Sequence, residues 1–113
     1  MSRKNKLIET PPYAIEQTLK RLGANLRTAR LRRNLTIDAV AQKIGTGPRA
    51  IANAEKGKVS AGIGIYAALL WALGLLKQLD DVADPVKDQE GLALSLHNER
   101  ERARQHKDID NDF

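Results

Sequence analysis

The sequence predicts an all-helical (all-α) fold. Apolar residues recur at spacings of three and four over most of residues 14–83, which is the period of amphipathic helices. Glycine or proline stands where such helices would end, at Gly45, Gly57, Gly74 and Pro85. The length of 113 residues favours one compact domain with short tails. We therefore expect a flexible basic arm at 1–13, a helical domain at 14–84 and a tail at 85–113.

The arm and the first helix differ sharply in composition. The arm is polar and ends in Pro11 and Pro12, and because proline disfavours helix in the residue before it, we expect no helix there. A first helix is predicted from about Ala14 to Arg33, where apolar residues form one stripe and arginines crowd the last turn. The stripe consists of Ile15, Leu19, Leu22, Leu26 and Ala29.

Two short helices follow, joined by a tight turn. The first begins after Thr36, a favourable N-cap, and ends at Gly45, which suits the left-handed residue that closes a helix. The second has Gly47 as its N-cap and Pro48 at its first position. Ala41 is small enough to let these helices approach each other closely. Two short helices held at a steep angle by such a turn form a helix-turn-helix motif.

The second short helix offers a polar face. Ile51 would anchor it in the core, which leaves Arg49, Asn53 and Lys56 on the opposite side at spacings i, i+4 and i+7. Arginine can bond two acceptors of guanine, and asparagine can bond the edge of adenine. Lys56 and Lys58 are placed to touch phosphates. A merely solvated surface is the alternative, because any surface helix has a polar face.

The charge of the chain is divided unevenly. Residues 1–60 hold 13 Lys and Arg against 4 Asp and Glu, whereas residues 61–113 hold 6 against 10. A basic half favours a polyanionic partner such as nucleic acid. Uneven charge is also common among soluble proteins, so the charge supports this interpretation without deciding it.

The run from Thr36 to Gly57 resembles the phage-repressor (Xre-type) helix-turn-helix family. The most specific matches are Thr36, Ala41, Lys43-Ile44-Gly45, Ile51, Glu55, Gly57 and Ala72-Leu73-Gly74. The resemblance implies a five-helix lambda-repressor-like domain, a symmetric homodimer and binding of double-stranded DNA at palindromic operators. By position it implies base contacts from Pro48, Arg49, Ala50 and Asn53. We expect contacts to the DNA backbone from Thr36, Ile37, Lys43, Thr46, Gly47, Lys56 and Lys58.

The sequence departs from that family at several of these positions. Ile37 stands where the family usually has glutamine, and Gly47 stands where serine or threonine usually opens the recognition helix. Pro48 and Ala50 offer no side-chain hydrogen bond. Specificity is therefore expected to depend on Arg49, on Asn53 and on DNA shape.

The fourth predicted helix, Ile63–Leu73, is too apolar for a helix with one buried face. We expect Ile63, Tyr66, Ala67, Leu70 and Leu73 to fill the core. A fifth helix is predicted from Leu75 to Ala83. The surplus apolar residues predict a two-fold homodimer through Ile65, Ala68, Trp71, Ala72, Leu75, Leu76 and Leu79. The alternative is that Trp71 packs under the C-terminal tail.

The tail suggests a second partner. The stretches Leu75 to Pro85 and Asp88 to Leu94 resemble HipB-type antitoxins, which implies a HipA-like serine/threonine kinase toxin as partner and repression of the shared operon. Leu92, Leu94 and Leu96 alternate with small residues, which is the period of a short strand. A disordered solubilising tail, a free-standing repressor and a protein-binding adaptor without DNA binding remain the alternatives.

Other classes of function lack their signatures. The chain has no cysteine, and His97 and His106 stand nine residues apart without clustered partners, so we expect no metal and no cofactor. No phosphate-binding loop or activated nucleophile is present, and we expect no enzyme. No targeting segment is visible, and the longest apolar stretch, Ile63 to Leu76, is too short to span a bilayer. A cytoplasmic, nucleoid-associated protein is expected.

Overall fold

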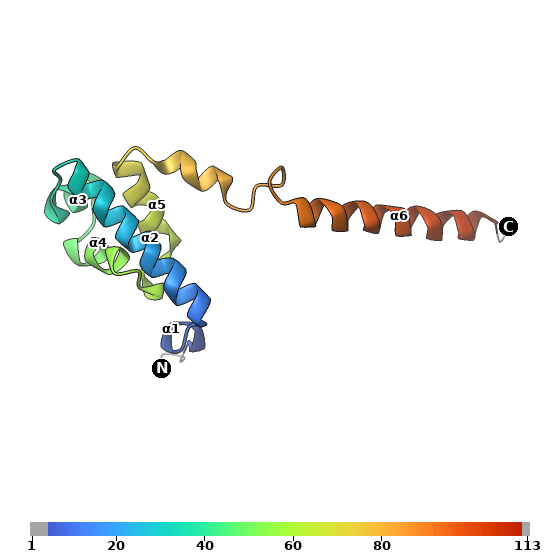
Figure 1. Cartoon of the computed structure of the whole chain (residues 1–113), viewed down its shortest axis with the longest axis horizontal. Coiled ribbons are helices and arrows are strands. Elements are labelled where there is room, and N and C mark those ends of the chain that lie inside the picture. Colours follow the sequence, from blue (N-terminus) through green and yellow to red (C-terminus); the bar gives the residue numbers. More distant parts are fainter. Residues whose placement is uncertain (1–4, 112–113) are drawn as a thin grey trace. The chain divides into compact units, whose positions relative to one another are not determined.

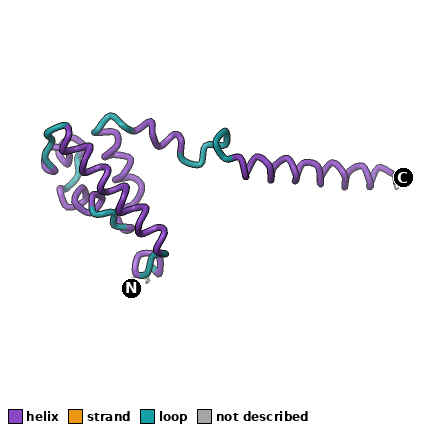
Figure 2. The backbone as a smooth tube through the Cα atoms, viewed as in Figure 1, coloured by secondary structure: helices purple, strands orange, loops and turns teal. Residues whose placement is uncertain are grey.

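The computed structural model describes residues 5–111, so the first four residues of the expected arm and the last two of the expected tail lie outside it. The chain forms two compact units, residues 1–76 and 77–113, and the division falls within the segment 75–83 that we expected to be a fifth helix. No strand occurs in the described range (Figure 2), which confirms the helical fold.

The first unit contains the predicted helix-turn-helix. Its elements are α1 (Lys6–Glu9), α2 (Tyr13–Arg32), α3 (Ile37–Ile44), α4 (Pro48–Glu55), the short 3-10 helix η1 (Val59–Ala61) and α5 (Gly62–Ala72) (Figure 1). The bounds of α2, α3, α4 and α5 confirm the first four predicted helices to within one residue at each end. The five-helix count is not confirmed, because α1 and η1 are additional.

The arm contains a helix that the sequence reasoning excluded. α1 begins after Asn5, whose side-chain oxygen Oδ1 accepts a hydrogen bond from the Leu7 amide at 3.0 Å. It ends at Glu9, before Pro11 and Pro12. The two prolines therefore stop this helix but do not prevent a turn of helix ahead of them, and the expectation of none was wrong.

The core lies where α3, α4 and α5 meet and where α2 crosses α4. Its apolar members are Leu26, Val40, Ala41, Ile51, Ala54, Tyr66, Leu69, Leu70, Ala72 and Leu73. Two residues expected inside are not there: Ile15 is 41% exposed and Ile63 is 72% exposed. Each lies in the first turn of its helix, ahead of the packed segment. Leu69, which the sequence reasoning did not select, occupies the core instead at 1% exposure.

The second unit differs from the sequence prediction in both of its elements. A 3-10 helix, η2 (Leu76–Asp81), replaces the predicted fifth α-helix. A long helix, α6 (Gln89–Asn111), includes Leu92–Leu96, so the possible strand there was wrong. Asp88 starts α6, since its Oδ1 accepts a hydrogen bond from the Gly91 amide at 2.9 Å. No described helix is long and apolar enough to cross a bilayer.

Candidate nucleic-acid interface

The turn between α3 and α4 has the predicted local structure. The Thr36 hydroxyl oxygen accepts a hydrogen bond from the Ala39 amide at 3.0 Å, which caps α3. Gly45 closes α3 with a φ of 88°, in the left-handed region that glycine favours. The amides of Gly45 and Thr46 both donate to the carbonyl oxygen of Ala41, at 2.8 and 2.9 Å. These bonds confirm Thr36 as the N-cap and Gly45 as the closing residue.

α4 turns one face inward and the other outward. Gly47 is extended and Pro48 opens the helix, as the sequence predicted. Ile51 and Ala54 are fully buried at 0% exposure, so they anchor the helix from beneath. Arg49 is exposed and Asn53 is partly exposed. The structure therefore places this arginine and this asparagine where a ligand can reach them.

An open groove runs beside this outward face, with a volume of ≈ 730 Å³. Its lining residues are Ile37, Asp38, Pro48, Arg49, Ala52, Asn53, Lys56 and Lys58, and we call this surface the α3–α4 groove. It brings together six of the residues that the sequence assigned to base or backbone contacts. Thr36, Thr46, Gly47 and Ala50 are not among its lining residues, although Thr36, Gly47 and Ala50 each lie next to a residue that is.

The main chain of Lys58, at the edge of the groove, is fixed by a hydrogen bond from α5. The Tyr66 hydroxyl donates a hydrogen bond to the Lys58 carbonyl oxygen at 3.1 Å. Tyr66 is 4% exposed, and this burial raises the pKa of its phenol, because the charged phenolate is poorly solvated inside the protein. α5 thus fixes the main chain from which the Lys58 side chain extends.

Lys43 does not lie with the other expected DNA-backbone contacts. Its ammonium donates to the Ala72 carbonyl oxygen at 3.2 Å and stands 5.6 Å from the centre of the Trp71 ring. A cation over an indole face is attracted by the ring electrons, and a cation also suits the carbonyl end of a helix. Lys43 therefore joins α3 to the end of α5 and is not among the residues that line the α3–α4 groove, and its contact with the DNA backbone stays a prediction.

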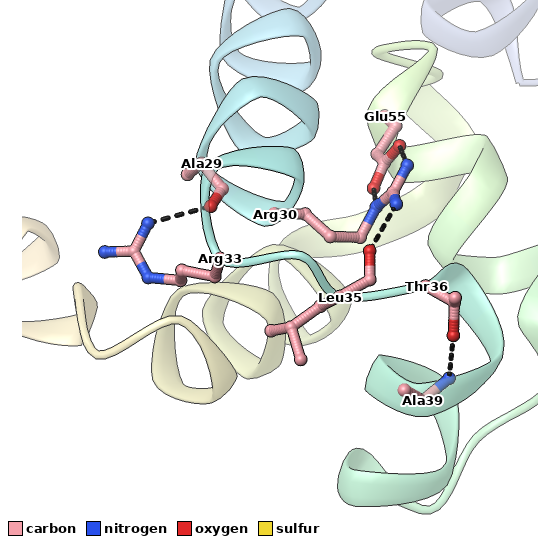
Figure 3. Close-up of polar contacts among 7 residues, drawn as sticks. All are labelled: Ala29, Arg30, Arg33, Leu35, Thr36, Ala39 and Glu55. Carbon is pink, nitrogen blue, oxygen red and sulfur yellow. Dashed lines mark hydrogen bonds and ion pairs between the residues drawn. The ribbon is translucent and has the colours of Figure 1, made fainter.

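A buried ion pair holds α4 against α2 (Figure 3). Arg30 donates from Nε to Glu55 Oε2 at 2.7 Å and from Nη2 to Glu55 Oε1 at 3.0 Å. Its Nη1 donates to the Leu35 carbonyl oxygen at 2.8 Å. The hydrogen bonds to Glu55 raise the pKa of Arg30 above its ordinary value. Arg30 is one of the arginines that crowd the last turn of the first predicted helix, and Glu55 is one of the matches to the family, but the sequence did not predict that the two would pair.

Two glycines allow main chains to approach closely around this pair. A Cβ at Gly23 would lie 2.4 Å from the Glu55 carbonyl oxygen and 2.6 Å from that of Ala54, so α2 and the end of α4 touch there. Gly57 has a φ of 73°, and a Cβ on it would lie 2.4 Å from the Leu19 carbonyl oxygen. Neither position accepts a side chain without a shift of α2 against the end of α4.

The residues expected at a dimer interface are only partly accessible. Trp71 is 53% exposed and Leu76 is 40% exposed, while Ile65, Ala68 and Leu75 are half-buried. Ala72 is 6% exposed and belongs to the core of its own chain, because its side chain points to the inner side of α5. Leu79 lies in the second unit. Among the residues expected at the interface, Trp71 is therefore the most exposed large apolar side chain of the first unit.

The fold and the groove define a helix-turn-helix protein, and a comparison with known families agrees. A family model described as a helix-turn-helix domain matches residues 21–82, more than half of the chain. The chain belongs to this helix-turn-helix family and is a DNA-binding protein of that class. Neither the curated proteins nor the solved structures gave a match.

Proposed function

We propose that the chain is a sequence-specific transcriptional repressor that binds a palindromic operator as a homodimer and catalyses no reaction. The observation that carries this proposal is the α3–α4 groove, where Arg49 and Asn53 stand beside Lys56 and Lys58 on the exposed side of an anchored helix. Guanidinium and amide groups suit base edges, and ammonium groups suit phosphates.

Specificity in this proposal is limited to a few side chains. Pro48, Ala52 and Ile37 supply an apolar wall to the groove and no side-chain hydrogen bonds. Arg49 and Asn53 then make the direct base contacts. Further discrimination comes in part from the shape and deformability of the duplex, including base pairs that the protein does not touch.

The homodimer is proposed through the apolar face around Trp71. An exposed tryptophan beside half-buried Ile65, Ala68 and Leu75 is typical of an interface centre. A two-fold dimer would present two recognition helices about 34 Å apart, one turn of the duplex. Sedimentation of Trp71→Glu tests this: a monomer is expected, and an unchanged dimer mass would exclude Trp71 from the centre of the interface.

Selection from a pool of random-sequence duplexes tests DNA recognition. We expect the chain to enrich an inverted repeat whose half-sites are about 10 base pairs apart, with affinity that falls steeply as salt rises. Arg49→Ala should weaken binding by roughly 1–3 kcal/mol and relax one base position in each half-site. Equal binding of every operator variant by parent and Arg49→Ala would show that Arg49 does not read bases.

A second candidate function adds a protein partner, as in the antitoxin of a HipA-like kinase toxin. It is favoured by the second unit, whose large apolar residues are exposed: Val82, Val86, Leu92, Leu94 and Leu96. Co-elution of the chain with the product of the neighbouring gene is expected, and Leu92→Glu with Leu96→Glu should abolish it. Failure of the parent to co-elute would leave a free-standing repressor. An absence of all duplex binding would leave a protein-binding adaptor.

A further inference from the structure

The α3–α4 groove contains a carboxylate among its cations. Asp38 is the acidic member of the eight lining residues, which include Arg49, Lys56 and Lys58. Its residue is exposed, and within the described part of the chain its side chain makes no ion pair and accepts no hydrogen bond. A negative charge in a groove that receives phosphates opposes binding unless the nucleic acid supplies a donor to it.

The other carboxylates of the basic half differ from Asp38 in their placement. Glu55 is buried against Arg30, and Glu16 pairs with Lys20 at 3.0 Å. Glu9 lies in the arm, in the four-residue helix α1. Asp38 is thus the acid that faces the proposed DNA site without a protein cation of its own.

The local structure of α3 explains only in part why position 38 holds an aspartate. A carboxylate in the first turn of α3 suits the positive end of the helix. The cap of the helix is already supplied by Thr36, whose hydroxyl oxygen bonds the Ala39 amide. A neutral polar residue at position 38 would keep that cap and would remove the repulsion of phosphate.

We propose that Asp38 determines specificity by lowering affinity for duplexes of the wrong sequence. This inference rests on the proposed DNA-binding function. In the correct complex the carboxylate accepts a hydrogen bond from an exocyclic amino group in the major groove, of cytosine or adenine, which offsets its repulsion. On other sequences no such donor is aligned, and the carboxylate only repels the backbone. Asp38 therefore widens the gap between specific and non-specific binding.

The test compares Asp38→Asn with the parent on two duplexes of equal length, one selected by the parent and one of random sequence. Asp80→Asn is the matched control, because it removes one exposed negative charge from the second unit. Dissociation constants are measured by fluorescence anisotropy at about 0.05 M and 0.2 M salt. Urea unfolding of each variant reports whether α3 remains stable.

Asp38→Asn should bind the random duplex about fivefold more tightly at low salt, the scale of one charge pair at contact in water. The gain should shrink at high salt. The selected duplex should gain less than about twofold, so the specificity ratio falls, and Asp80→Asn should keep the parent's ratio. Equal gains on both duplexes, or no gain on either, would overturn the role of Asp38 while leaving DNA binding intact. A parent that selects no sequence would instead refute the proposed function itself.

Discussion

The ion pair between Arg30 and Glu55 allows a sharp prediction about stability. Both side chains are buried, at 8% and 6% exposure, and two hydrogen bonds of 2.7 and 3.0 Å join them. Glu55→Gln keeps the shape of the side chain but leaves the guanidinium buried without its counter-charge. Removing one partner of a buried pair costs about 3–5 kcal/mol, and we expect the lower end because glutamine retains one oxygen. A domain of this size has only about 5–15 kcal/mol of total stability.

Urea unfolding followed by far-ultraviolet circular dichroism measures this free energy. Glu16→Gln is the matched control, because it breaks the Glu16–Lys20 pair, whose side chains are 41% and 55% exposed, and should cost at most about 1 kcal/mol. Replacing both buried partners by methionine should recover most of the loss, since no uncompensated charge remains. A Glu55→Gln variant that is no less stable than Glu16→Gln would show that the buried pair does not stabilise the domain more than an exposed one.

Two further predictions concern stability. Gly23→Ala should lower the free energy of unfolding by about 1–3 kcal/mol, because its Cβ would lie 2.4 Å from the Glu55 carbonyl oxygen. Gly64→Ala is the matched control: its Cβ would meet nothing within 4 Å, so it should be neutral or stabilising in the same urea assay. Burial raises the pKa of the Tyr66 phenol above its ordinary value of 10.0. The contribution of the neutral phenol to the free energy of unfolding is therefore complete below pH 10.0 and is lost as the pH rises through the folded-state pKa. The parent should therefore lose stability above about pH 10 more steeply than Tyr66→Phe, and parallel pH profiles would contradict this.

The sequence predicted the helix-turn-helix well because its signals are local. Thr36, Gly45 and Pro48 each act on the few residues beside them, and the observed cap, left-handed turn and helix start are the ones expected. The outward position of Arg49 follows from the burial of Ile51 two residues later on the same short helix. The period of an α-helix fixes which of these residues can share a face.

The parts that were missed depend on contacts between distant segments. Arg30 and Glu55 are 25 residues apart, and neither helix by itself indicates that they meet. Gly23 looks like a weak point of α2 until the main chain of α4 is seen against it. The contact of Lys43 with Trp71 depends on how α3 packs against α5, which the sequence of neither helix indicates.

The strand predicted in the second unit was wrong for a different reason. Alternating leucines at 92, 94 and 96 predict a strand only when one face is buried, but all three are about half exposed or more in α6. With no burial to select a period, the Asp88 cap and the helix-forming residues that follow determine the conformation.

Chemical-shift mapping tests directly whether the outward face of α4 receives DNA. A ¹⁵N-labelled chain is titrated with the duplex that it selects, and backbone amide shifts are followed by NMR. The largest changes are expected at residues 37–38, 47, 49–53 and 56–58, and Arg49→Ala should diminish them. Largest changes on the exposed side of α2 or in residues 77–111, with the groove unaffected, would contradict this expectation.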